Sequence, residues 1–290
     1  MKLFEFWDGI KLGNNHREAV LAMKFEETEC ERLCELYKMD HNEFFQEVLK
    51  KEESNLWFLW LYSNMACEVY ERYKKEGIAK QVFWDTFQDI RFWCENTERE
   101  FGIMGLAVYE WFYRHIDMVL FRFGRLQFEV MKLEETVIDK ENIVKDNCFS
   151  REQRKNGGNK YKRTMCIEKG TQVINIHIAQ GEPLTWEACE KSIKLAKAFW
   201  GEDKPYVCHS WLLYPGLDEV LSETSNIREF RHHFKVLQVD YREREAEWRV
   251  FGKVLKNVVE YPEETSLQRR VKEYLLAGKS LGNGWAVLEM

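Results

Sequence analysis

The placement of proline divides the chain into two parts of different construction. The first 182 residues contain no proline, and the four prolines lie at positions 183, 205, 215 and 262. Proline removes a backbone donor and interrupts helices, so a long proline-free stretch permits long uninterrupted helices. We therefore predict a helical N-terminal domain over residues 1–122. An α/β domain is predicted over residues 123–290, with a mixed sheet flanked by helices.

Apolar residues in the first part recur with the period of an α-helix. From position 54 to 75 they are spaced by three and four residues, and Ser54 is the expected N-cap. The same spacing predicts helices over residues 80–99 and 106–121. Consecutive helices are thus expected from residue 15 to about residue 122.

The pattern changes to that of a sheet after Gly124. Residues 125–133 alternate between apolar and polar side chains, as a half-buried strand does. A later strand, helix and strand imply a parallel pair with a right-handed connection. We expect residues 166–167 to form a hairpin with the strand that follows. The other expected elements are strands over 172–179, 206–213, 235–240 and 247–251 and helices over 186–200, 217–221, 226–234 and 266–277.

Charge and apolar runs restrict the classes of partner. The chain has 43 basic and 49 acidic residues, a net charge of −6, whereas general nucleic-acid binders carry a basic domain or stripe. The aromatic run 56–62 is far shorter than the ~18 apolar residues of a membrane span. The N-terminus has acids within its apolar stretch, unlike a signal peptide. We predict a soluble cytoplasmic protein with no nucleic-acid or membrane partner.

Two further features have simple interpretations. None of the eight cysteines forms a Cys-x-x-Cys pair, so reduced structural thiols and no metal site are expected. The basic stretch 151–163 is a candidate contact for phosphate or an acidic partner, and an ordinary solvated loop is the alternative.

The segment Gln180–Thr185 is the most informative short stretch. It follows the carboxyl end of an expected central strand and precedes a helix, where open α/β sheets bind ligands. Backbone N–H groups at such a helix start attract phosphate. Gly181 lets the backbone approach a ligand closely, and Thr185 is the expected helix cap. An ordinary strand-to-helix turn is the alternative interpretation.

Two histidines lie near the ends of the expected parallel strands. His177 and His209 have the side chain best suited to accept a proton near neutral pH. Cys208 precedes His209, and alternation places the two on opposite faces, which argues against a nucleophile–base pair. For each histidine the alternative is a hydrogen-bonded side chain in an apolar strand.

Several of these stretches together resemble a family of bacterial two-domain acyltransferases. The C-terminal stretches resemble its GNAT-like domain, and the others resemble its N-terminal acyltransferase domain. They are 174–189 (INIHIAQGEPLTWEAC), 207–213 (VCHSWLL), 225–227 (SNI), 89–96 (DIRFWCEN) and 121–129 (FRFGRLQFE). The resemblance covers roughly residues 80–252.

The resemblance implies a site for acetyl-CoA or another acyl-CoA. In the GNAT superfamily the pantetheine lies between two splayed parallel strands, here 172–179 and 206–213, and the pyrophosphate meets the following loop. The implied binding residues are Ile178, Ala179, Gln180, Gly181, Leu184 and Thr185. The implied catalytic residues are His177 or His209 as base, with Tyr214 nearest in sequence to the usual tyrosine acid.

Two functions follow from this resemblance. The first is an N-acyltransferase that moves an acyl group from acyl-CoA to the amine of a small molecule or peptide. The second is a non-catalytic GNAT-derived binding or sensor protein. The superfamily loop reads Gln/Arg-x-x-Gly-x-Gly/Ala, whereas this chain has Gln-Gly-Glu-Pro-Leu-Thr, with the acid Glu182. That departure favours the second function, and a basic contact near the loop, such as Lys191 or Lys194, would favour the first.

Overall fold

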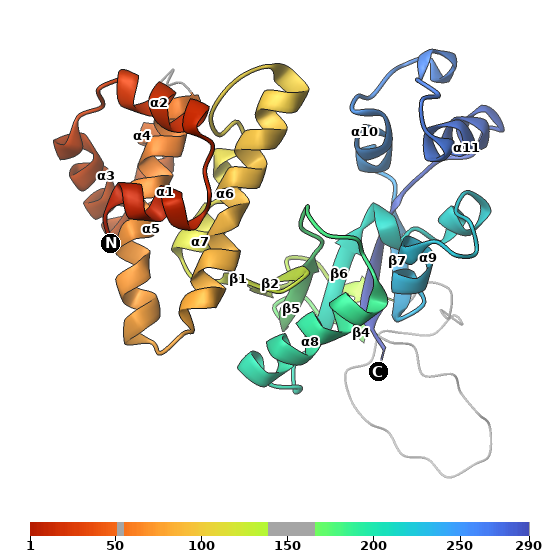
Figure 1. The fold of residues 1–290 in the computed structure, drawn as a ribbon. Helices are drawn as coiled ribbons and strands as arrows, with labels where there is room; N and C mark the ends of the chain where they lie inside the picture. The colour runs from red at the N-terminus through yellow and green to blue at the C-terminus, as the bar shows by residue number, and fades with distance from the viewer. Residues whose placement is uncertain (51–54, 139–165, 290) are drawn as a thin grey trace, which may run out of the picture. The chain divides into compact units, whose positions relative to one another are not determined.

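The chain folds into two compact units, each with its own core. The computed structural model describes residues 1–50, 55–138 and 166–289. Unit 1 comprises Met1–Glu129 and Ile178–Glu182, and unit 2 comprises Val130–His177 and Pro183–Met290 (Figure 1). The five residues Ile178–Glu182 therefore group with the helical unit, although the residues on either side of them do not.

Helices make up most of unit 1, as predicted. The longest are α5, Asn55–Lys75, and α6, Lys80–Phe101. Helix α5 buries aromatic and aliphatic residues around most of its circumference, and α1, α2, α3 and α6 all contact it. A helix that is apolar all round is stable only when it is surrounded. The other helical segments are α1 Leu3–Gly9, α2 Asn14–Ala22, α3 Glu27–Met39, α4 His41–Lys50, η1 Tyr109–Trp111 and α7 Tyr113–Ile116. The proposed cap Ser54 lies outside the described residues.

The predicted helix over residues 106–121 is wrong. That stretch holds the 3-10 turn η1, the single-turn helix α7 and the first strand, β1, Leu120–Phe123. The helix ends because Met118 adopts a left-handed backbone conformation, with φ of 58°. The β-branched Val119 and the aromatic residues after it then favour an extended strand.

A tight hairpin follows in unit 1. Strand β1 pairs antiparallel with β2, Leu126–Lys132, and Arg122 lies opposite Gln127. The connection is Gly124–Arg125, and Gly124 has a φ of 63°. Two-residue hairpin turns need such left-handed positions, and glycine supplies one without strain.

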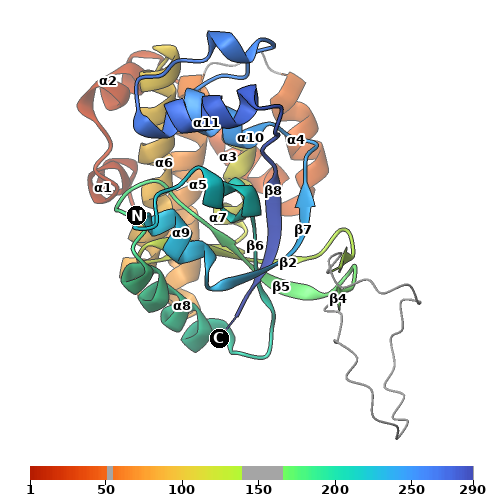
Figure 2. The same cartoon turned by 90° about the vertical axis from the view of Figure 1, so that its right-hand side faces the viewer.

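Unit 2 contains the other strands of a six-stranded mixed sheet whose order is β1-β2-β5-β6-β8-β7. Strands β5, Gln172–His177, and β6, Tyr206–Ser210, are parallel, and helix α8, Trp186–Trp200, connects them. Strand β8, Asn283–Leu288, pairs antiparallel with β6 and with β7, Phe234–Asp240 (Figure 2). The other elements of unit 2 are β3 Val137–Ile138, β4 Cys166–Ile167, η3 Trp211–Leu213, η4 Pro215–Glu219, α9 Asn226–Arg231, α10 Glu245–Phe251, η5 Val258–Glu260 and α11 Ser266–Leu276. The predicted fold class is confirmed.

Two strand predictions in unit 2 are wrong. Strand β4 pairs with β3 in a separate two-stranded sheet rather than with β5. Residues 247–251 form the end of α10, not a strand, because Glu247 and Phe251 are buried four residues apart, as on one face of a helix, and Gly252 ends the helix at a φ of 70°. Strand β8, which the sequence pattern does not predict, lies between β6 and β7 in the sheet.

Candidate functional site

The parallel strands β5 and β6 pair for only part of their length. Ile174 lies opposite Tyr206 and Asn175 opposite Val207. Both strands continue beyond these pairs, β5 to His177 and β6 to Ser210. Over the continuing residues, no β5–β6 pairs are found in the described part of the chain. The strands therefore diverge at their carboxyl ends, as the predicted splay requires.

His209 lies on the diverging part of β6. Its ring stacks on Trp285, its partner across the β6–β8 ladder, with centroids 4.6 Å apart. Its Nε2 is buried and has no hydrogen-bond partner among the described residues. Burial lowers the pKa of His209 below its ordinary value, although the carboxylates of Asp240, Glu245 and Glu243 act in the opposite direction. A neutral imidazole with a free nitrogen is able to accept a proton at neutral pH.

His177 occupies the corresponding position at the end of β5. Continuing the register from the two pairs sets it level with His209, on the diverging strand. Its Nε2 lies 3.2 Å from the side-chain nitrogen of Asn175, and the side chain is half-buried. His177 is thus held by a neighbour on its own strand, whereas Nε2 of His209 is unengaged. Cys208 is fully buried, and burial raises the pKa of its thiol, which makes it a poor nucleophile.

Tyr214 lies at the edge of a cavity in unit 2. Its hydroxyl is 3.2 Å from that of Tyr274, and its ring is 6.0 Å from the ring of Tyr241. Burial raises the pKa of Tyr214, so the phenol stays protonated at neutral pH. The cavity has a volume of about 590 Å³. Its lining includes Tyr214, Tyr241, Arg244, Glu247, Tyr274 and Lys279.

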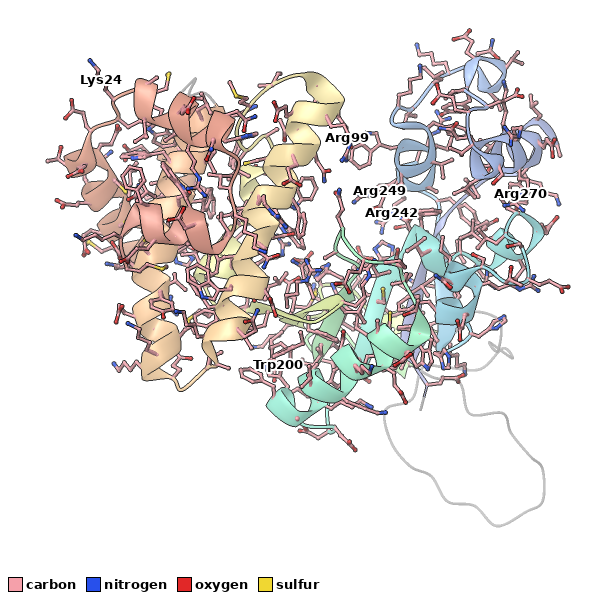
Figure 3. The ribbon with its side chains drawn as sticks, viewed as in Figure 1. Lys24, Arg99, Trp200, Arg242, Arg249 and Arg270 are labelled. Atoms are coloured by element: carbon pink, nitrogen blue, oxygen red, sulfur yellow. The ribbon has the colours of Figure 1, made fainter. Side chains whose placement is uncertain are left out.

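The residues just after β5 belong to unit 1 and are fixed by two of its side chains. Arg125 Nη1 donates a 2.6 Å hydrogen bond to the carbonyl oxygen of Ala179. Asn96 donates from its side chain to Gln180 Oε1, and Arg99 in turn donates to Asn96 Oδ1. Arg99 lies near the C-terminal end of α6 (Figure 3). These contacts anchor the loop at the carbonyl of Ala179 and at the side chain of Gln180.

Arg122 approaches the same loop from the hairpin. Its side chain is only 8% exposed, and Nε donates to the carbonyl oxygen of Gly124 at 2.9 Å. A methyl group added to Gly181 would lie 3.3 Å from Arg122 Nη2, so the guanidinium faces the loop closely. Gly181 has a φ of 139°, which side chains rarely adopt.

The remaining predicted loop residues lie in unit 2 at the start of α8. Thr185 is the N-cap, and its hydroxyl accepts a 3.4 Å hydrogen bond from the amide of Ala188, as predicted. Leu184 is buried. Ile178 lies between His177 and Ala179 and is half-buried. The two lysines named as basic contacts that would favour the enzyme pair with helix neighbours, Lys191 with Glu187 and Lys194 with Glu190.

The sequence interpretation missed a second charged cluster in unit 1. The carboxylate of Asp89 is buried, lies 3.2 Å from Nε2 of His115 and accepts a 2.7 Å hydrogen bond from Trp111. These contacts lower the pKa of Asp89 in spite of its burial. The sequence interpretation also missed Arg122 and Arg125, which contact the loop. Their signal in the sequence is two charged residues between aromatic residues, in a stretch that otherwise predicts a core strand.

The remaining sequence predictions concern the basic stretch, the cysteines, metal ligands and membrane spans. The basic stretch 151–163 lies outside the described residues. Within the described ranges, no cluster of three or more potential metal ligands is present, and the seven described cysteines are free thiols. No helix in those ranges has the length and apolar character that a bilayer crossing demands.

Two family models together span almost the whole chain. Residues 1–118 match the N-acyltransferase N-terminal domain, and residues 120–288 match the GNAT-like C-terminal domain. The chain belongs to this two-domain N-acyltransferase family. The resemblance drawn from the sequence motifs is thereby confirmed. A comparison with curated proteins found no match.

Solved acyltransferase structures share the fold. One in complex with decanoyl-CoA aligns with a TM-score of 0.62 at 20% identity, over 81% of this chain and 66% of its own. A mutant acyltransferase in complex with octanoyl-CoA aligns at 0.71 and 18% identity, over 99% and 87%. A third, in complex with decanoyl-CoA and teicoplanin, aligns at 0.69 and 19% identity, over 98% and 87%. At these identities the likeness establishes the fold.

Proposed function

We propose that this family member is an acyl-CoA-dependent N-acyltransferase that uses acetyl-CoA or a longer acyl-CoA. The observation that carries the proposal is the divergence of β5 and β6 beyond Asn175 and Val207, followed directly by the loop at Gln180. Parallel strands that part in this way leave backbone N–H and C=O groups facing one another without ladder partners. Such groups are suited to bind the amides of a pantetheine arm.

Known structures with this fold support the choice of donor. Those aligned above were solved with decanoyl-CoA or octanoyl-CoA. In this chain the segment Gln180–Thr185 precedes the capped helix α8, whose first N–H groups attract an anion. The proposed binding residues are Ile178, Ala179, Gln180, Gly181, Leu184 and Thr185.

His209 is the proposed general base. The acceptor nitrogen attacks the thioester carbonyl carbon, a C–N bond forms and the C–S bond breaks. His209 Nε2 accepts the proton that the nitrogen loses, for which its burial and its free nitrogen suit it. A proton from Tyr214 goes to the departing thiolate in this proposal. His177 is the alternative base, because it occupies the matching position on β5.

The surroundings of His209 favour a cationic acceptor. Asp240, Glu243 and Glu245 all exert a negative field on His209, opposed by Arg242 (Figure 3). An amine arrives largely as an ammonium ion at neutral pH, and a negative field attracts it. The ammonium ion loses one proton to water before the neutral nitrogen attacks. The tyrosine-lined cavity beside Tyr214 has room for an aromatic or peptide-like body. One aligned acyltransferase was solved with teicoplanin and another with CoA and 10C-teicoplanin, so a peptide-like amine is the proposed acceptor class.

Calorimetry and turnover test the proposal in two steps. Isothermal titration with acetyl-CoA, octanoyl-CoA and desulfo-CoA measures donor binding, and micromolar affinity is expected for at least one of them. Release of free thiol with a panel of amines then measures transfer. Replacement of His209 by Ala is expected to reduce turnover by about 10²- to 10⁴-fold while donor affinity stays unchanged. His177→Ala is the matched comparison.

Three results would contradict the proposal in different ways. No binding of any acyl-CoA would remove the donor site. Binding without transfer to any amine would leave the non-catalytic binding protein as the better description. Full turnover in both single histidine variants would remove these side chains from the mechanism while leaving the donor site intact.

A further inference from the structure

The guanidinium of Arg122 has hydrogen-bonding capacity that the described part of the chain does not use. Nε donates to the Gly124 carbonyl, and the backbone N–H donates to Thr86 Oγ1 at 2.9 Å. Nη1 is buried, and no hydrogen-bond partner for it is found among the described residues. A buried charged donor without a partner is costly, so such a group is expected to have a ligand in the working protein.

The other terminal nitrogen of the same guanidinium, Nη2, lies against the candidate phosphate loop. Arg122 Nη2 is 3.3 Å from the point where a Gly181 side chain would begin. Arg125 holds the loop backbone at the Ala179 carbonyl, and Asn96 holds the side chain of Gln180. A side chain at position 181 would therefore occupy the space in front of the guanidinium, and glycine leaves that space open.

Three carboxylates act on Arg122, and each is either engaged by another side chain or exposed to solvent. Burial lowers the pKa of Arg122, and the carboxylates of Asp89, Asp85 and Glu182 partly restore it. Asp89 is engaged by His115 and Trp111, as described above, and Glu182 is exposed. Arginine presents a planar set of donors that matches phosphate oxygens, and it remains charged when buried.

We infer that Arg122 binds an oxygen of the acyl-CoA diphosphate together with the backbone at Gln180–Gly181. The inference rests on the proposed function and explains how the atypical loop works. The superfamily signature has two small residues at the positions of Pro183 and Thr185 in this chain. This chain also carries an acid, Glu182, just before them. A side-chain cation from the β1–β2 hairpin supplies the attraction for phosphate and offsets the charge of Glu182.

Donors with and without the diphosphate separate this contact from general effects. The variants Arg122→Met and Arg122→Lys are titrated with inorganic pyrophosphate, octanoyl-CoA and S-octanoyl-pantetheine, which lacks the diphosphate. Arg122→Met should lose about 10- to 100-fold in affinity for the first two, the range expected for a charge-assisted hydrogen bond, and less than threefold for the third. Arg122→Lys keeps the charge but not the planar donors, and we expect an intermediate loss.

Arg91→Met is the matched control. Arg91 also acts electrostatically on Arg122, and its own Nε lies 3.7 Å from Glu95. The variant Arg91→Met removes the same charge from the same region. We expect its affinity for octanoyl-CoA to stay within about threefold of the wild type, because the partly exposed charge of Arg91 is screened by solvent. Thermal melting of each variant checks that it is folded, and Arg122→Lys provides the test if Arg122→Met is not.

The outcomes distinguish the contact from the proposed function. If octanoyl-CoA binds both Arg122 variants as tightly as the wild type, the contact is refuted and the donor site stands. An equal loss for S-octanoyl-pantetheine also refutes it, because the arginine then acts on the fold of the site. If the wild type binds pyrophosphate but no acyl-CoA, the proposed function fails and with it the assignment of the anion to acyl-CoA.

Discussion

Two buried tyrosines are expected to respond in opposite directions to the same substitution. The Tyr261 hydroxyl donates to Glu247 Oε2 at 2.7 Å and accepts from the amide of Leu255 at 2.9 Å and from Arg244 Nη2 at 3.2 Å. The Tyr62 hydroxyl is buried and has no hydrogen-bond partner among the described residues. The rings are almost equally buried, at 2% and 0% exposed, so replacement by Phe changes only the hydroxyl.

The magnitudes follow from what each hydroxyl contacts. Tyr261→Phe removes a hydrogen bond to a charged carboxylate, worth about 1.5–3 kcal/mol, and leaves the Leu255 amide without its acceptor. Glu247 keeps Arg244, whose Nε lies 2.6 Å from Oε1, so the net loss is about 2–4 kcal/mol. Tyr62→Phe removes a buried polar group that gains nothing, and we expect about 0.5–2 kcal/mol of added stability.

Scanning calorimetry provides the assay. At about 2–4 °C per kcal/mol for a unit of this size, Tyr261→Phe should lower one transition by roughly 5–12 °C. Tyr62→Phe should raise a transition by a few degrees. The reasoning is refuted if Tyr261→Phe costs less than about 1 kcal/mol, or if Tyr62→Phe destabilises the protein, because the Tyr62 hydroxyl would then have a partner.

Three other predictions concern the site and its supports. The acid limb of the kcat/KM profile should have its midpoint below pH 6.5, because burial lowers the pKa of His209 and activity falls only as the pH drops through that lowered value. The variant His209→Gln should abolish the acid limb, and a midpoint above pH 6.5 would argue against His209 as the base. Thr185→Val should cost about 1 kcal/mol in urea denaturation through loss of the cap on Ala188, and an unchanged midpoint would show that the cap is not needed. Hydrogen bonds from Arg242 hold the pKa of Asp240 at about 2, so the pair stabilises the fold at pH values above the ordinary pKa of 3.8, and this stabilisation is lost as the pH falls towards 2. The variant Arg242→Ala should raise the pKa of Asp240 in an NMR titration, and an unchanged pKa would rule out the contact.

The sequence predicts elements well where local signals agree. Helix α8 has the predicted bounds Trp186–Trp200 because a Thr cap, helical apolar spacing and Gly201 all indicate the same ends. Residues 247–251 fail because five residues that alternate polar and apolar fit a short helix as well as a strand. Strand β8 fails because Gly284 within it and Gly282 just before it weaken the strand pattern, although Gly284 is needed where the backbone passes the Leu213 carbonyl.

The site divides in the same way. His177, His209 and the loop at Gly181 are candidates that the sequence alone can propose, because strand ends and glycines are local features. Arg122 is not found, because its importance depends on burial and on the approach of a segment almost 60 residues further along the chain. Periodicity places a charged residue on a strand, but it does not tell whether that charge lacks a partner.

The discontinuous make-up of unit 1 has a consequence for how relatives of this chain exchange parts. Residues Ile178–Glu182 group with Met1–Glu129, although the residues on either side of them group with unit 2. A recombination event near residue 129 would join a foreign Arg125 to a resident Ala179 and would keep their hydrogen bond only if both parents carry it. A chimaera that folds should therefore take residues Ile178–Glu182 from the same parent as residues Met1–Glu129. We expect these two segments to evolve together.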